Sequence, residues 1–218
     1  MSGRKRVAIL ISGRGSNMAN LIKAAKAPNY PAEISLVISN KPDATGLNIA
    51  QSAGVRTFVI DHMAQSSREG FDAALHEKLI GERIELVACA GFMRIMTAGF
   101  VEKWRDRMIN IHPSLLPSYK GLNTHARALA DGVKIHGCSV HFVRHDVDAG
   151  PIIAQAAVAV EERDDADKLA ARVLAAEHLL YPHALALVAS GRARVEGEHV
   201  VIDGKTIHAS PLIVPPIG

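Results

Sequence analysis

The sequence predicts an α/β fold, with a doubly wound, mostly parallel sheet flanked by helices and a small C-terminal hairpin. Three observations support this prediction. In the first half, apolar β-branched runs alternate with helical segments, which is typical of parallel strands buried on both faces. A glycine-containing turn joins the first run to the first helix. In the second half, two longer apolar runs flank a polar loop.

The first half contains short apolar runs that are separated by segments of helical pattern. The predicted strands are Val7–Ser12, Ile34–Ser39, Arg56–Ile60, Leu86–Ala90 and Met108–Ile111. The predicted helices are Met18–Lys26, Ala44–Ser52, the amphipathic Ser66–Gly81, and Ala98–Trp104. This alternation predicts a doubly wound unit, in which ligands bind at the carboxyl ends of the strands.

The second half of the chain has longer predicted strands and a longer helix, and it belongs to the same domain. Its predicted helices are Gly121–Asp131 and about Asp165–Leu180, the second capped by Asp164 or Asp165. Its predicted strands are Cys138–Val143, Ile152–Val160 and a hairpin over Arg194–Val201 that turns at Gly197. Residues 211–218 are predicted to form a tail. We expect one domain over residues 1–218, with halves of about 1–105 and 106–218.

Composition narrows the function classes. Of 218 residues, 4% are aromatic and the formal charge is only +3, which argues against a nucleic-acid partner. No apolar run approaches the roughly 20 residues of a membrane span, so we expect no membrane partner. The two cysteines, Cys89 and Cys138, do not make a disulfide framework. A reducing cytoplasm is therefore the expected location.

The segment Gly13–Asn17 lies between the first predicted strand and helix. Glycines there allow backbone N–H groups to approach an anion at the positive end of the helix. The alternative is a tight turn in which Ser16 or Asn17 only caps the helix. A dinucleotide is disfavoured because Met18 replaces the third glycine of the usual fingerprint. The turn therefore predicts a site for a monophosphate.

Asn110 and His112 lie two residues apart on a predicted strand, and Pro113 follows them. Residues two apart on a strand share a face, so an amide and an imidazole converge at the carboxyl edge of the sheet. The alternative is a histidine that is satisfied by local hydrogen bonds. The two interpretations stay open on this evidence.

The loop of residues 145–151 is rich in carboxylates, and the alternative to a functional role is a solvated turn. A carboxylate near His112 would favour the imidazolium, which stabilises developing negative charge. On the last long helix, Glu177 falls on or beside the apolar stripe of Leu169, Val173 and Leu180. A buried acid there needs a cation or ligand hydroxyls as partner, and a shifted helix that exposes Glu177 is the alternative.

Histidines are clustered in one part of the chain. Of the eleven histidines, five lie between residues 112 and 145, namely His112, His125, His136, His141 and His145. A metal site is disfavoured because the four-residue spacing of His141 and His145 suits a helix, whereas this segment is predicted as strand then loop.

Four segments together resemble one family. They are GRGSN, ACAGFMRIM at 88–96, INIHPSLLPSYKG at 109–121, and DVDAGPII at 146–153. The chain resembles the phosphoribosylglycinamide formyltransferase family from about Arg6 to Arg194. The resemblance implies a Rossmann-like formyltransferase fold. It also implies transfer of a formyl group from 10-formyltetrahydrofolate to the amine of glycinamide ribonucleotide in purine synthesis, without a metal.

The resemblance also implies residue roles. The catalytic set would be Asn110, His112 and Asp148. Gly15, Ser16, Asn17 and Glu177 would bind the phosphate and ribose of the ribonucleotide. The folate site would comprise Arg68, Phe92, Met93, Arg94, Ile95, Met96, Val143, Asp146 and Gly150, with His125 and His141 supporting the catalytic set. Three positions depart from many relatives, namely Lys120, Asn123 and Ala149.

Four other functions share part of this sequence pattern. A formyltetrahydrofolate hydrolase would use the same catalytic set with water as acceptor. Hydrolases and methionyl-tRNA formyltransferases resemble this chain plus a further domain, for which 218 residues leave no room. A nucleotide-binding reductase or a folate-binding module without activity would leave Asn110, His112 and Asp148 unexplained. We expect only small-molecule partners and a monomer or homodimer.

Overall fold

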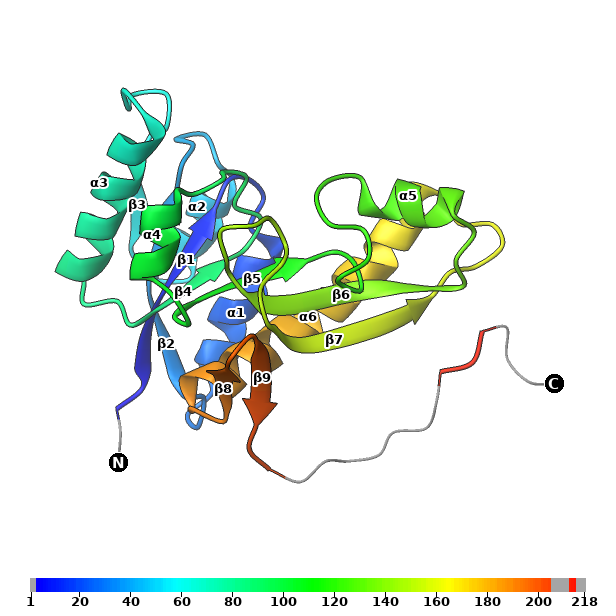
Figure 1. Cartoon of the computed structure of the whole chain (residues 1–218). Coiled ribbons are helices and arrows are strands. Elements are labelled where there is room, and N and C mark those ends of the chain that lie inside the picture. Colours follow the sequence, from blue (N-terminus) through cyan, green and yellow to red (C-terminus); the bar gives the residue numbers. More distant parts are fainter. Residues whose placement is uncertain (1–2, 205–211, 215–218) are drawn as a thin grey trace.

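One seven-stranded sheet organises residues 3–204 and 212–214, which the computed structural model describes (Figure 1). In chain order its strands are β1 (Lys5–Ile11), β2 (Ala32–Ser39), β3 (Thr57–Val59), β4 (Leu86–Cys89), β5 (Met108–His112), β6 (Ile135–Phe142) and β7 (Ile152–Ala159). The helices are α1 (Ser16–Ala25), α2 (Gly46–Ser52), α3 (Arg68–Gly81), α4 (Ala98–Lys103), α5 (Thr124–Ala130) and α6 (Ala166–Ala189). A separate hairpin consists of β8 (Ala193–Glu196) and β9 (His199–Ile202).

The strand order is β3-β2-β1-β4-β5-β6-β7. The first five strands are parallel, whereas β6 pairs antiparallel with both β5 and β7. The predicted doubly wound, mostly parallel sheet with a small hairpin is therefore confirmed. Because the order reverses between β1 and β4, the carboxyl ends of these strands open a crevice of the kind that binds ligands.

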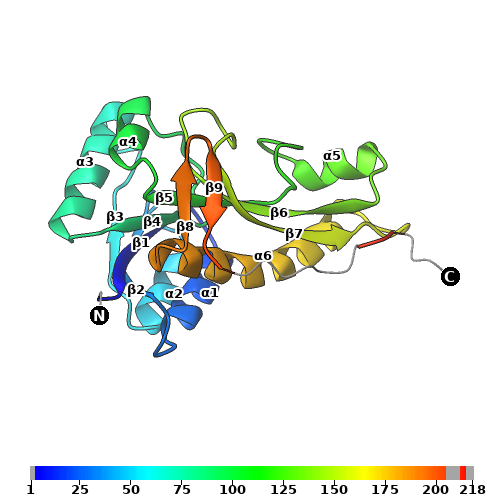
Figure 2. The same ribbon diagram turned by 60° about the horizontal axis from the view of Figure 1, so that its bottom comes forward.

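Alternating side chains divide the core between the two faces of the sheet. On β1, Ile9 and Ile11 pack against α1, α2 and α6, whereas Ala8 and Leu10 pack against α3 and α4. Figure 2 shows these helices on opposite sides of the sheet. On β5, Ile109 and Ile111 face α6. Asn110 and His112 therefore point to the other face, as strand alternation predicts.

The boundaries differ from the prediction where tertiary packing overrides a local signal. The last long helix was predicted to end at Leu180, but α6 continues through Pro182 to Ala189. Tyr181, Ala184 and Leu185 on that stretch are fully buried, and their burial offsets the backbone hydrogen bond that a proline removes.

Other differences lie at turns and at the C-terminus. The helix predicted from Gly121 begins at Thr124, because Gly121 and Asn123 both adopt positive φ. Strand β6 begins three residues earlier than predicted, at Ile135. Of the predicted tail, only residues 212–214 are described. None of the described helices combines the length and apolarity that a membrane span requires.

A glycine substitution tests the packing of the antiparallel strands. A Cβ at Gly137 on β6 would lie 2.0 Å from the carbonyl oxygen of Ala156 on β7. We expect Gly137→Ala to lower the free energy of unfolding by about 2 kcal/mol or more. In Gly99→Ala the new Cβ meets nothing within 4 Å on α4, so this control should gain up to about 1 kcal/mol. Urea unfolding measures both, and equal effects would contradict the predicted close contact.

Candidate functional site

A cavity of about 1080 Å³ lies at the carboxyl ends of β1, β4 and β5. Its wall includes Arg14 after β1, Gly91–Met96 after β4, and Asn110–Pro113 at the end of β5. Two further segments complete the wall, with Gly121–His125 on one side and residues of the β6–β7 loop, including Val143 and Asp148, on the other. The cavity therefore opens where the reversal of strand order predicts a ligand site.

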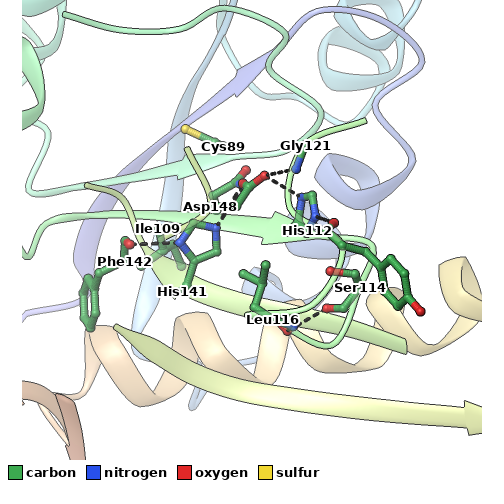
Figure 3. Close-up of polar contacts among 12 residues, drawn as sticks. Cys89, Ile109, His112, Ser114, Leu116, Gly121, His141, Phe142 and Asp148 are labelled. Carbon is green, nitrogen blue, oxygen red and sulfur yellow. Dashed lines mark hydrogen bonds and ion pairs between the residues drawn. The ribbon is translucent and has the colours of Figure 1, made fainter. Parts of the chain in front are cut away.

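His112 has a polar partner at each ring nitrogen (Figure 3). Its Nδ1 lies 3.2 Å from Asp148 Oδ2, and its Nε2 lies 3.0 Å from the backbone carbonyl oxygen of Tyr119. A carboxylate and a carbonyl oxygen only accept hydrogen bonds, so both contacts are satisfied when both nitrogens carry hydrogen. Both ring nitrogens of His112 therefore face acceptor oxygens.

Asp148 links three segments through one buried carboxylate. Oδ2 contacts His112 and accepts a hydrogen bond from the Gly121 N–H at 2.9 Å. Only 10% of the side chain is exposed. Burial acts to raise the pKa of Asp148, but the neighbouring His141, the Gly121 N–H and the charge of His112 outweigh it and the pKa is lowered. Asp148 is therefore placed to remain ionised beside His112.

Asn110 is oriented by His141 across the β5–β6 pair. The two residues are register partners, and Asn110 Nδ2 lies 3.3 Å from His141 Nε2. His141 Nδ1 lies 2.9 Å from the carbonyl oxygen of Phe142 and donates to it. His141 Nε2 also lies 3.7 Å from Asp148 Oδ1, so this ring stands between the Asn110 amide and the Asp148 carboxylate. Asn110 lines the cavity, where its amide can bind a ligand oxygen.

The segment after β4 forms an apolar wall with alternating orientation. Phe92 and Met96 pack against the core on the α3 side, whereas Met93 and Ile95 are exposed by 70% and 56%. The Arg94 guanidinium lies over the Phe71 ring at 4.5 Å. Ser12 Oγ accepts a hydrogen bond from the Met93 N–H at 2.8 Å. The wall is thus fixed to the end of β1, and it offers apolar surface to a flat ligand.

The turn after β1 has the geometry of an anion site. Gly15 is the N-cap of α1 with φ 74°, and it provides no side-chain acceptor for the first N–H groups of the helix. The alternative in which Ser16 or Asn17 serves as the N-cap is therefore not seen. Gly46 packs against this turn, and a Cβ there would lie 2.9 Å from the Gly13 carbonyl oxygen. Backbone N–H groups remain free for an oxyanion at this turn.

Glu177 is buried, so the alternative of a shifted helix that exposes it is wrong. It is 7% exposed, and its Oε2 accepts a hydrogen bond from Asn17 Nδ2 at 2.6 Å. Burial raises the pKa of Glu177, although the Asn17 hydrogen bond opposes this. The other amide atom of Asn17, Oδ1, is buried without a partner among the described residues. This pair therefore keeps polar capacity for a ligand beside the anion turn.

Seven predicted residues lie outside the cavity wall, namely Gly15, Ser16, Asn17 and Glu177 at the anion turn, and Arg68, Asp146 and Gly150. Arg68 begins α3, and Asp146 is exposed at the tip of the β6–β7 loop; neither lines the cavity. Gly150 is buried, and a Cβ there would lie 1.8 Å from the Phe142 carbonyl oxygen. Its requirement for glycine is thus explained by the close approach of the loop to β6. Of the departing positions, Asn123 lines the cavity, while Lys120 and Ala149 are exposed.

The predicted supporting residue His125 and the neighbouring His136 form an aromatic cluster beside the site. The His125 and His136 rings lie 5.3 Å apart, and His136 also packs on Tyr119. Burial lowers the pKa of His125, and it lowers that of His136 to about 4. These rings are therefore neutral near pH 7. The described residues contain no group of three histidine, cysteine, aspartate or glutamate side chains arranged to hold a metal.

Among the cavity residues to which the sequence assigned no role are two arginines. Arg14 lies within the glycine turn and lines the cavity. Arg144 precedes the carboxylate loop and also lines the cavity. For Arg14 the sequence did hold a signal, which is a cationic side chain inside a glycine turn that was predicted to bind an anion. Arg144 had no comparable signal, because its partners are distant in the sequence.

Comparisons with known proteins identify the family. Residues 5–185 match the family described as formyl transferase. The chain belongs to the formyl transferase family. The phosphoribosylglycinamide formyltransferase of Escherichia coli is 41% identical over 201 residues, which cover 92% of this chain and 95% of the relative. The glycinamide ribonucleotide transformylase 1 structure from Symbiobacterium toebii superposes with a TM-score of 0.90 at 44% identity. It covers 93% of this chain and 95% of that structure.

Larger proteins also contain this formyl transferase region. The trifunctional purine biosynthetic protein adenosine-3 of Homo sapiens is 50% identical over 192 residues, which are 88% of this chain but 19% of the relative. The chain thus spans about a fifth of the length of the first curated relatives that it matches. The resemblance inferred from the sequence motifs is confirmed.

The buried histidines of this formyl transferase predict a pH dependence of stability. The folded-state pKa of His136, about 4, lies below the ordinary value of 6.5, so the unfolded chain binds more protons between these pH values. Stability should therefore fall as the pH drops from 6.5 to 4. By linkage, His136 contributes about 1 to 2 kcal/mol of this loss between pH 7 and pH 5.

Urea unfolding at several pH values measures this slope. His136→Asn should make it shallower, whatever the variant's stability at pH 7. His62→Asn is a matched control, because His62 is partly exposed at the end of the sheet, and it should keep the slope. A slope unchanged in His136→Asn would contradict the prediction.

Proposed function

We propose that this protein transfers the formyl group of 10-formyltetrahydrofolate to the amine of glycinamide ribonucleotide, a step of purine synthesis. The observation that carries the proposal is the meeting of Asn110, His112 and Asp148 at one end of a largely apolar cavity. An amide can donate a hydrogen bond to an oxyanion, and an imidazolium can stabilise one by its positive charge. Acyl transfer to an amine passes through a tetrahedral oxyanion and therefore needs such stabilisation.

The proposed mechanism follows from the contacts of these three residues. The neutral substrate amine attacks the formyl carbon, and negative charge develops on the formyl oxygen. An amide N–H of Asn110 donates to that oxygen, and the positive charge of the His112 imidazolium stabilises it, because both His112 ring nitrogens already face protein acceptors. Asp148 holds His112 in the charged form through the 3.2 Å contact. A proton passes from the amine to the folate nitrogen as the carbon–nitrogen bond to the donor breaks, and no covalent enzyme intermediate forms.

The rest of the site divides between the two substrates. The wall of Phe92–Met96 and residue Val143 would receive the folate ring system, since exposed apolar side chains line the cavity there. The free N–H groups after Gly15 would bind the phosphate, and Asn17 with Glu177 would bind the ribose hydroxyls. Arg68, Asp146 and Gly150 remain proposed folate-site residues that lie outside the cavity wall of this structure. His125 and His141 would support the catalytic set.

We also propose that the protein works in the cytoplasm on small molecules alone, as a monomer or homodimer. Both cysteines are buried free thiols, which suits a reducing compartment.

An assay with two acceptor conditions tests the proposal. The protein is mixed with 10-formyltetrahydrofolate, with and without glycinamide ribonucleotide, and both tetrahydrofolate and the formylated ribonucleotide are measured. We expect turnover only when the ribonucleotide is present. Formyl release without acceptor would instead assign a hydrolase, and no turnover in either mixture would overturn the enzyme assignment.

Asp148→Asn tests the electrostatic part of the mechanism. The amide keeps the shape of the side chain but removes the charge that favours imidazolium, so kcat should fall by roughly 100-fold or more. Asp164→Asn is a matched control, because Asp164 is equally well buried against Arg172 but does not line the cavity. The control should stay within about threefold of the parent protein. Similar rates for Asp148→Asn and Asp164→Asn would remove the mechanism.

Glu177→Gln should separate binding from stability. Burial raises the pKa of Glu177, so its charge opposes folding at neutral pH, and the neutral amide should raise Tm. The same change weakens the acceptor for ribose hydroxyls, so KM for the ribonucleotide should rise about tenfold. Thermal unfolding without ligand and steady-state kinetics measure the two effects. A lower Tm together with an unchanged KM would contradict the assignment.

A further inference from the structure

Arg144 begins the loop between β6 and β7 and reaches two carboxylates outside it. Its Nη2 lies 2.7 Å from Asp106 Oδ1, and its Nε lies 3.3 Å from Glu198 Oε2. Only 10% of the Arg144 side chain is exposed. Isolated ion pairs on a surface contribute little, but a mostly buried guanidinium shared by two carboxylates forms a network with defined geometry.

The partners of Arg144 come from separate parts of the chain. Asp106 lies in the turn before β5, and Glu198 lies at the tip of the hairpin formed by β8 and β9. Figure 2 shows this tip reaching up to the β6–β7 loop. Arg105 Nη2 also lies 2.8 Å from Glu198 Oε1. Two arginines therefore hold one carboxylate at the hairpin tip.

Arg144 in turn holds both ends of its loop. Its Nη1 donates to the carbonyl oxygen of Val143 at 3.2 Å. Its Cγ lies against Gly150, 3.1 Å from where a Cβ would stand. The Arg144 side chain also lines the cavity together with Val143 and Asp148. A displacement of Arg144 would thus move the wall that holds Asp148.

We propose that Asp106 and Glu198 position Arg144, and that the β8–β9 hairpin thereby keeps the loop of residues 143–150 in its ligand-binding conformation. Arg144 acts as a positioning residue because one protein acceptor at each of Nε, Nη1 and Nη2 fixes the orientation of its guanidinium. That the ligand next to this loop is the formyl donor rests on the proposed function. Neither the hairpin nor Glu198 lines the cavity. Of the two arginines that pair with Glu198, Arg144 lines the cavity and Arg105 does not, so Arg144 is the direct route from Glu198 to the donor.

Glu198→Gln tests this coupling at a residue away from the ligand. We expect KM for 10-formyltetrahydrofolate to rise roughly threefold, because a single network ion pair is lost, while kcat and KM for the ribonucleotide stay within error. Glu196→Gln is the matched control. It removes a carboxylate of the same hairpin that pairs with Arg194, and it should leave all three constants unchanged. Arg144→Lys keeps the charge and should raise KM less than Arg144→Ala does.

Amide hydrogen exchange provides a second readout that needs no activity. The amides of residues 143–150 should exchange several-fold faster in Glu198→Gln than in Glu196→Gln, while those of β6 stay protected. If the parent protein has no activity, the proposed function fails, but the exchange comparison still tests the positioning. Identical exchange and identical donor KM in the two hairpin variants would overturn the proposal.

Discussion

The site depends on the return of the β6–β7 loop along β5. Strand β6 runs antiparallel to β5, so Phe142 at its end pairs with Ile109, before the residues that face the cavity. The chain must then travel back for Asp148 to meet His112. The carboxylate of Asp148 stabilises this path by contacting both His112 and the Gly121 N–H. One side chain therefore joins β5, the segment before α5 and the loop.

Two buried carboxylates of this protein, Asp148 and Glu177, have pKa values that are shifted in opposite directions. Asp148 has a cationic neighbour and a backbone donor, so its pKa is lowered despite burial. Glu177 has only the amide of Asn17, so burial dominates and its pKa is raised. In the proposed mechanism, Asp148 is preorganised for a reaction that develops negative charge. Glu177 is suited to bind the neutral hydroxyl groups of a ligand.

Local sequence patterns predicted those features of the fold and the site that follow from the periodicity of strands and helices. The alternation of apolar runs and helices predicted the doubly wound sheet, and the two-residue spacing of Asn110 and His112 predicted their common face. The predicted end of the last helix at Leu180 was wrong, because the burial of Tyr181 and Leu185 that extends α6 to Ala189 comes from tertiary packing, which a local pattern does not contain. The distance from Asp148 to His112 could not be predicted at all. It depends on a loop path with positive φ at Asp148, and the contacts of Arg144 with Glu198 span 54 residues without any periodic signature.

The register between β5 and β6 has a consequence for how such proteins diverge. Asn110 pairs with His141, and His112 pairs with Ser139, so all four side chains share one face. A single-residue insertion in either strand would turn one pair of side chains toward α6 and abolish the arrangement in one step. Insertions in the β6–β7 loop leave that pairing untouched. The two strands therefore tolerate substitution but not insertion or deletion, whereas a loop of altered length must still return a carboxylate to His112.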